Sequence, residues 1–119
     1  MKLRYHHLGI PTHRELPAED YIPKLRISAS GFDKSQFGIE WMKFDDDCNM
    51  PELVRRVPHL AFVTDNLKEA IAGKEILIEP NSPSKGVTVA FIIENGAPVE
   101  LLQFDSPDDE IWPENALYR

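Results

Sequence analysis

The sequence predicts an α+β fold of two similar halves, each a strand-helix-strand-strand-strand module, with the first module shortened. Three observations support this. Similar strands open the halves, at Tyr5–Ile10 and Val57–Phe62. Both closing strands, Ile39–Phe44 and Val99–Phe104, carry a glutamate followed four residues later by a phenylalanine. Finally, 119 residues suit one compact domain, whereas either half alone is too small to bury a core. We therefore expect the halves to share one body.

The first module is expected to span residues 1–45. Its predicted segments are a strand over Leu3–Ile10, a proline-containing stretch that holds at most a short helix, a strand over Lys24–Ala29 and a closing strand over Gln36–Phe44. Compared with the second module, one strand is missing. The run after Phe44 is polar and rich in turn-forming residues, so we expect a linker over 46–56 with a short helical turn at Glu52–Arg55.

The second module, residues 57–105, has the clearer pattern. Its predicted elements are a strand over Val57–Val63, a helix capped by Asp65 or Asn66 and ended by Gly73, a strand over Lys74–Ile78, a buried strand over Gly86–Ile93 and a closing strand over Pro98–Phe104. The run Glu79–Pro83 should break the chain between two strands. The pair Asn95-Gly96 is a strong hairpin signal.

Composition restricts the functional classes. Hydrophobic residues make up 42% and charged residues 28%, as in a globular protein, and no apolar run approaches the ~18 residues of a membrane helix. The N-terminus lacks the pattern of a signal peptide. The net charge of −7 opposes binding to nucleic acid and to anionic membranes. We expect a cytoplasmic protein whose partner is a small molecule, with neither nucleic acid nor a membrane as partner.

The C-terminal tail, residues 106–119, and the duplication both bear on assembly. Trp112, Leu117 and Tyr118 are too apolar to remain fully exposed, so we expect the tail to lie against the body or a partner chain. Short duplicated modules favour symmetric pairing, which predicts a homodimer.

The duplication also aligns four polar side chains. His7 corresponds to His59, and Glu40 corresponds to Glu100, each glutamate lying in an otherwise apolar row of its strand. A carboxylate that is buried and unpaired costs roughly several kcal/mol, so each glutamate needs a cation, a hydrogen-bond network or water. Two imidazoles and two carboxylates are the ligand set of a divalent metal such as Zn, Ni, Co, Mn or Fe. The alternative is two ordinary His-Glu pairs without a metal.

Three further side chains bear on the site. Strand alternation puts Tyr5 on the face of His7, so Tyr5 is a candidate substrate contact. Arg26, on a predicted strand, is a second candidate because a guanidinium can bind a substrate carboxylate. Alternation sends His6 to the opposite face from His7, which predicts a surface or helix-facing role for His6.

These residues resemble the vicinal oxygen chelate superfamily, which includes glyoxalase I, methylmalonyl-CoA epimerase, extradiol dioxygenases and bleomycin resistance proteins. The resemblance is strongest in His7–Ile10, His59–Leu67 and Gly96–Leu102. It implies paired modules that form a curled mixed β-sheet cup, within one chain or across a dimer. It also implies metal ligation by His7, Glu40, His59 and Glu100.

The resemblance implies a metal-dependent lyase or isomerase of the glyoxalase or epimerase type. Its substrate would be a small 2-oxo or 2-hydroxycarbonyl compound that reacts through an enediolate-like intermediate, with Glu100 or Glu40 as the catalytic base. Two alternatives stay open: a metal-free drug-binding protein like those for bleomycin, and an Fe(II) dioxygenase. The cupin fold is disfavoured, because its ligand histidines alternate with another residue whereas His6 and His7 are adjacent.

Overall fold

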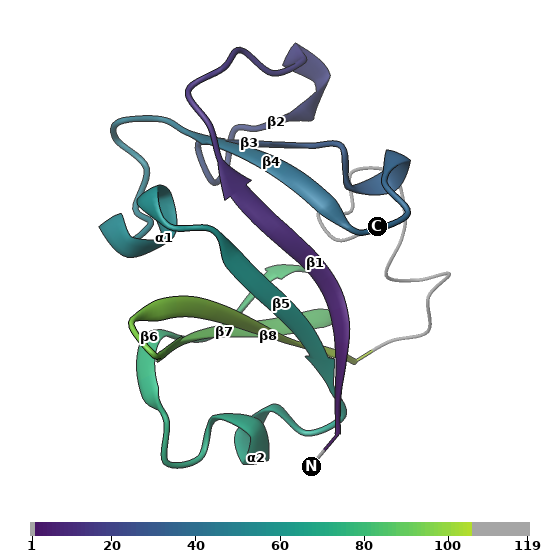
Figure 1. Cartoon of the computed structure of the whole chain (residues 1–119), viewed down its shortest axis with the longest axis vertical. Coiled ribbons are helices and arrows are strands. Elements are labelled where there is room, and N and C mark those ends of the chain that lie inside the picture. The colour runs from purple at the N-terminus through teal and green to yellow at the C-terminus, as the bar shows by residue number, and fades with distance from the viewer. Residues whose placement is uncertain (1, 106–119) are drawn as a thin grey trace.

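Eight strands form one mixed sheet that curls into a half-barrel (Figure 1). The computed structural model describes residues 2–105. The strands are β1 (Leu3–Pro11), β2 (Tyr21–Ile22), β3 (Ile27–Ser30), β4 (Ile39–Phe44), β5 (His59–Thr64), β6 (Glu75–Ser84), β7 (Val87–Glu94) and β8 (Ala97–Phe104). The helices are α1 (Glu52–Arg56) and α2 (Leu67–Ile71), with single 3-10 turns at η1 (Ala18–Asp20) and η2 (Phe32–Lys34). This arrangement is compatible with the predicted α+β class.

The strand order repeats between the halves of the chain. The sheet order is β2-β3-β4-β1-β5-β8-β7-β6, so β4, β3 and β2 extend outward from β1 just as β8, β7 and β6 extend outward from β5. The central pair β1·β5 is antiparallel, whereas β1·β4 and β5·β8 are parallel. The prediction that the first half lacks a strand was wrong, because β2 is present but only two residues long.

The edge strand β6 corrects a second prediction. It runs through the segment Glu79–Pro83, where a break was expected, and its pairing with β7 shifts register three times. Two prolines are tolerated there because β6 lies at the edge of the sheet, where one side of the strand needs no hydrogen-bond donors. The hairpin at Asn95-Gly96 is confirmed, and both residues have positive φ, 53° and 80°, as a type I′ turn requires.

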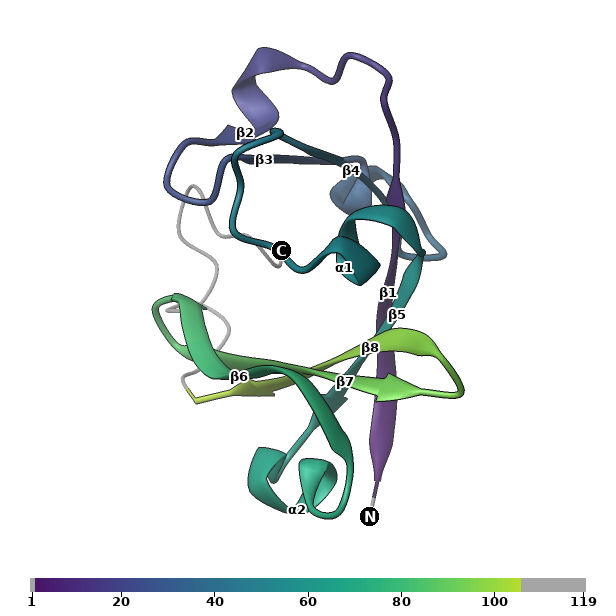
Figure 2. The same cartoon turned by 90° about the vertical axis from the view of Figure 1, so that its left-hand side faces the viewer.

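Apolar residues pack on both faces of the sheet. In Figure 2 the sheet is C-shaped, and α2 lies outside the curve, under β7 and β8. The outer cluster consists of Leu67, Ala70, Ala90, Ile92 and Leu101. The inner cluster, on the concave face, consists of Ala61, Val87, Val89 and Leu102. Asn66 caps α2, its side chain accepting a hydrogen bond from the Glu69 amide, as one of the two predicted caps.

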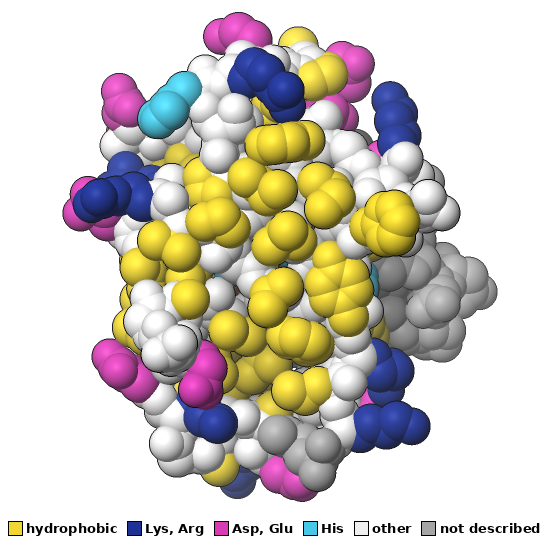
Figure 3. Space-filling view, in the orientation of Figure 1, with side chains coloured by type: hydrophobic (Ala, Val, Ile, Leu, Met, Phe, Trp, Pro, Cys, Tyr) yellow, Lys and Arg dark blue, Asp and Glu magenta, His cyan; other side chains and the backbone are white. Residues whose placement is uncertain are grey.

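The outer face over β1 and β5 is apolar (Figure 3). Within residues 2–105, the first half has no helix corresponding to α2. Leu60 is 45% exposed and Tyr5 is 49% exposed on this face. The homodimer stays a prediction. The predicted packing of Trp112, Leu117 and Tyr118 lies outside the described residues. Within those residues, neither helix has the length and apolarity that crossing a membrane would take.

Candidate metal centre

The four predicted ligands lie on the concave face, in two rows that cross the central strands. Gly9 of β1 pairs with Glu40 of β4 on one side and with His59 of β5 on the other. In the neighbouring row, Ala61 of β5 lies between His7 of β1 and Glu100 of β8. Since residues opposite one another in paired strands share a face, the register brings all four side chains to one side of the sheet. The small residues Gly9 and Ala61 leave room above the backbone for these side chains.

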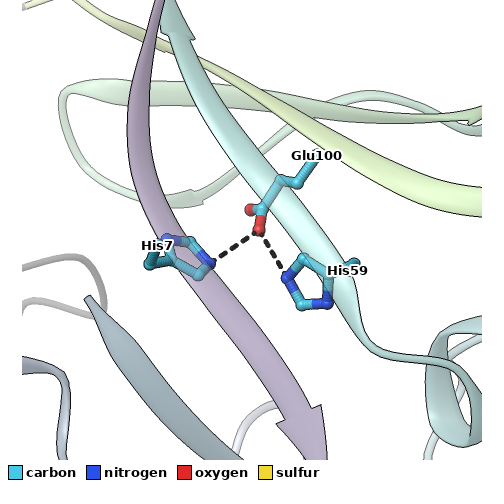
Figure 4. A group of neighbouring side chains, drawn as sticks. All are labelled: His7, His59 and Glu100. Atoms are coloured by element: carbon cyan, nitrogen blue, oxygen red, sulfur yellow. Dashed lines mark hydrogen bonds and ion pairs between the residues drawn. The ribbon is translucent and has the colours of Figure 1, made fainter. Parts of the chain in front are cut away.

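Three of the four side chains form a compact buried group. His7, His59 and Glu100 point toward one another from β1, β5 and β8 (Figure 4). Glu100 Oε1 lies 3.1 Å from His59 Nε2 and 3.2 Å from His7 Nε2. One ligand atom from each residue lies within 4.8 Å of the others, and none of the three residues is more than 2% exposed.

The spacing and chemistry of this group fit a divalent cation. A metal bound at about 2.0–2.2 Å holds neighbouring ligand atoms roughly 3 to 3.5 Å apart, as His7 and His59 already are from Glu100. Two imidazoles and one carboxylate suit Zn, Ni, Co, Mn or Fe equally. This buried group could therefore hold a metal ion, whose identity the donor set leaves open.

Glu40 faces the same space but stands apart from the group of three. Its Oε1 lies 3.9 Å from His7 Nε2, and the residue is 5% exposed. Burial raises the pKa of Glu40 to about 7; the charge of Glu100 adds to this and the charge of His7 opposes it. Glu40 is thus a second buried carboxylate beside the candidate centre, and without a cation its charged form is costly.

The pKa of Glu100 shifts in the opposite direction to that of Glu40, although Glu100 is more deeply buried. Burial alone would raise its pKa, but the hydrogen bonds from His59 and His7 outweigh burial, so the pKa of Glu100 is lowered. Burial alone would lower the pKa of His7, because it disfavours the charged imidazolium. The hydrogen bond to Glu100 and the charge of Glu100 outweigh burial, so the pKa of His7 is raised. The metal-free centre therefore holds a carboxylate beside a histidine that readily takes up a proton, and a cation would replace that proton.

His6 lies beside the centre, and the prediction that it faces away from His7 was wrong. The pairing of β1 with β5 shifts register between Tyr5 and His7, so a β-bulge brings both imidazoles to the same side. His6 Nδ1 is 2.7 Å from His7 Nδ1, and the His6 ring stacks on Phe32 with centroids 4.9 Å apart. Burial and the neighbouring His7 lower the pKa of His6 to about 4, against the charge of Glu100, so the ring is neutral near pH 7.

A neutral His6 can orient His7. A histidine that binds a metal through Nε2 carries its proton on Nδ1, and a hydrogen-bond acceptor there fixes the tautomer and the ring. His6 Nδ1 is at the right distance to accept that proton. Because the bulge brings both histidines to one side, their adjacency no longer disfavours a cupin. The parallel pairs β1·β4 and β5·β8 still do, because the cupin fold is an antiparallel double sheet.

The two predicted substrate contacts are not brought to the centre. Because of the bulge, Tyr5 pairs with Phe62 and lies on the outer face, where its hydroxyl donates to the Phe37 carbonyl at 2.8 Å. The prediction that Tyr5 shares the face of His7 was therefore wrong. Arg26 precedes β3 rather than lying in a strand, has a φ of 57°, and binds Asp47 at 2.9 Å.

Gly9 is a residue of the site that the sequence did not single out. A Cβ on Gly9 would lie 2.3 Å from Cε1 of His59, so the imidazole rests directly on the glycine backbone. Only the pairing register places Gly9 between Glu40 and His59. No local sequence signal reveals such a contact across strands.

We expect Gly9→Ala to displace His59 and to weaken metal binding by about 10- to 100-fold, the effect usual for disturbing a ligand's support. The added methyl should also cost on the order of 1–3 kcal/mol of unfolding free energy by overpacking. Calorimetric metal titration and denaturant unfolding would measure both quantities. In a His59→Ala background the Gly9→Ala cost in stability should vanish; an undiminished cost there would show that the methyl clashes with something else.

A cavity of about 100 Å³ lies above the four side chains. His7, Glu40, His59 and Glu100 all line it, and the Phe91 ring packs against His59 with centroids 5.1 Å apart. The remaining described walls are almost entirely apolar. A small molecule entering this cavity would therefore meet buried nitrogen and oxygen donors on one side and hydrocarbon on the others.

Comparisons with known protein families and curated proteins do not indicate a function for this chain. No protein-family model matches this chain, and no curated protein matches it in sequence. A fold alone does not determine a function, so geometry and chemistry at the centre carry the assignment.

Proposed function

We propose that this protein is a divalent-metal-dependent lyase or isomerase of the vicinal oxygen chelate superfamily, acting on a small 2-oxo or 2-hydroxycarbonyl compound. The observation that carries the proposal is the buried group of His7, His59 and Glu100 on the floor of a cavity, with a further buried carboxylate, Glu40, at its side. Two separate His-Glu pairs would give each histidine its own carboxylate, but both histidines contact Glu100, at 3.2 and 3.1 Å, whereas Glu40 is 3.9 Å from His7 Nε2. A cation shared by the group accounts better for the second buried carboxylate.

The position of each residue around the cavity suggests a different role for it. His7, His59 and Glu100 would hold the metal, and His6 would orient His7. When bound, a divalent cation acts as a Lewis acid that stabilises negative charge on substrate oxygens. Glu40 lies outside the group of three and lines the cavity, which supports a role as the base that would remove and return a proton at the carbon next to the substrate carbonyl. The apolar walls of the cavity would limit the access of water to that exchange.

Proton exchange tests this assignment even while the product is unidentified. Protein saturated with Co(II) or Mn(II) would be incubated in D2O with a panel of 2-oxo and 2-hydroxycarbonyl compounds, and deuterium uptake next to the carbonyl would be followed by NMR. We expect wild-type protein to accelerate uptake for at least one compound. Glu40→Gln should slow it by about 10²- to 10⁴-fold, the usual contribution of a general base, when both proteins are saturated with metal.

Glu75→Gln, at an exposed position, serves as the matched control and should exchange like wild type. Equal exchange by Glu40→Gln and wild type would refute the role of Glu40. Equal exchange by loaded and metal-free protein would refute metal dependence.

A second candidate is favoured by one observation. Two histidines and one carboxylate on a cavity floor are also the ligand set of Fe(II) oxygenases. That function predicts oxygen consumption by anaerobically Fe(II)-loaded protein on addition of a catechol, and no oxygen consumption with Zn(II). The proposed isomerase or lyase consumes no oxygen with either metal.

A further inference from the structure

The walls of the cavity constrain what can bind over the centre. Apolar side chains from both halves of the chain surround it, among them Ile22, Leu25, Ile27, Met42, Ile78 and Phe91. The volume of about 100 Å³ is comparable with the ~150 Å³ of an apolar cavity that takes up benzene. The space therefore suits a hydrocarbon group no larger than a ring or a short chain.

No cation lines the described part of the cavity. Its lining includes neither lysine nor arginine, and the guanidinium of Arg26, next to the wall residue Leu25, is bound to Asp47 at 2.9 Å. Among the described wall residues only Asn81 is polar, and its side-chain amide donates to the Glu79 carbonyl at 2.9 Å. An anionic group held against these walls, away from the metal, would lose its hydration without gaining a counterion, because Glu40 and Glu100 together already balance the charge of one divalent cation.

We propose that the substrate is a small uncharged compound with an oxygen-bearing head at the centre and a short aliphatic or aromatic body against the walls. Conjugates that carry a free carboxylate close to the reacting carbon, such as peptide-thiol adducts, are excluded from the class. This inference rests on the proposed function, because a metal held by His7, His59 and Glu100 would bind the oxygen-bearing head.

A series of hydroxamates with one metal-binding head and different bodies tests the inference. Acetohydroxamate supplies the head alone, hexanohydroxamate adds an aliphatic body, and adipic monohydroxamate has the same chain ending in a carboxylate. Their dissociation constants would be measured on Co(II)-loaded protein from changes in the visible absorption of the metal. We expect hexanohydroxamate to bind at least ten-fold more tightly than acetohydroxamate. Adipic monohydroxamate should bind at least ten-fold more weakly than hexanohydroxamate.

A charge placed in the wall should reverse this preference. Leu25→Lys adds an ammonium group at a half-buried wall position in a turn, where the long lysine stem can keep its charge near water. In this variant adipic monohydroxamate should bind more tightly than hexanohydroxamate. Leu60→Lys adds the same charge on the outer face and should keep the wild-type order.

The outcomes separate the two proposals. Equal affinity of wild-type protein for the charged and uncharged chains would overturn the substrate class while leaving the metal centre intact. Failure of the protein to bind Co(II), or of any hydroxamate to alter its absorption, would overturn the proposed function and the substrate class with it.

Discussion

His59→Ala is expected to abolish tight metal binding, whereas wild-type protein purified without chelator should carry about one divalent ion per chain. His59 Nε2 lies 3.1 Å from Glu100 Oε1 at the centre of the buried group, so its removal takes away one of three ligands. Disturbing a ligand's support costs 10- to 100-fold in affinity, and losing the ligand itself should cost at least about 100-fold. Elemental analysis and metal titration would measure the loss.

Thermal unfolding gives an independent measure of the same site. A ligand that binds only the folded state stabilises it by about 4 kcal/mol at a thousand times its dissociation constant. Adding metal should therefore raise the melting temperature of wild type and leave that of His59→Ala nearly unchanged. His13→Ala removes an exposed histidine and is the matched control, expected to respond like wild type.

The measurement also decides between a metal centre and two structural His-Glu pairs. If the pairs are purely structural, chelators and metals leave the melting temperature of wild type unchanged, and His59→Ala destabilises the chain through lost packing and a lost hydrogen bond alone. Indifference of the wild type to Zn, Ni, Co, Mn and Fe(II) would overturn the metal centre. The buried carboxylate of Glu40 argues against that outcome, because two structural pairs leave it 3.9 Å from its nearest histidine nitrogen.

The four polar residues of the site could be predicted from the sequence because they lie in repeated strands with regular alternation. His7, His59, Glu40 and Glu100 were found because the chain repeats itself, and the repeat reappears as matched strand order on both sides of β1·β5. Regular alternation then placed the four on one face. These predictions used only the period of two that every strand shares.

The wrong predictions concern places where the backbone departs from the two-residue alternation of a regular strand. One bulge in β1 moved Tyr5 to the outer face and brought His6 to the centre, and no residue type in the sequence marks a bulge at that point. Arg26 was expected in a strand, but it ends the turn before β3 with a φ of 57°. Residue propensities do not predict this left-handed conformation for a residue other than glycine. Gly9 was missed because its role depends on partners in two other strands.

Glu40→Gln is expected to make the metal-free protein more stable above pH 7. Burial raises the pKa of Glu40 to about 7, above its ordinary value of 4.5, so the folded chain holds this proton more tightly than the unfolded chain does. The resulting contribution to stability is fully present below pH 4.5 and is lost as the pH rises through 7. Above that, the charged carboxylate costs on the order of 3 kcal/mol relative to a neutral side chain.

Glutamine has the shape of glutamate without the charge, so the variant avoids that cost. Denaturant unfolding in chelator should find Glu40→Gln more stable than wild type by on the order of 3 kcal/mol at pH 8, with the difference shrinking toward zero near pH 4.5. Glu75→Gln, at an exposed position, should show no such pH-dependent difference. A variant less stable than wild type at pH 8 would mean that the Glu40 carboxylate is satisfied by the protein itself.

The same substitution should act in the opposite direction on metal binding. A carboxylate beside the centre attracts a cation, so Glu40→Gln is expected to weaken affinity by about ten-fold, equivalent to 1.4 kcal/mol, while it stabilises the metal-free fold. A residue that lowers the stability of the empty protein and improves the binding of a cation is retained for function rather than for folding. Stability and affinity changing in opposite directions would therefore identify the second buried glutamate as part of a working site, before any substrate is identified.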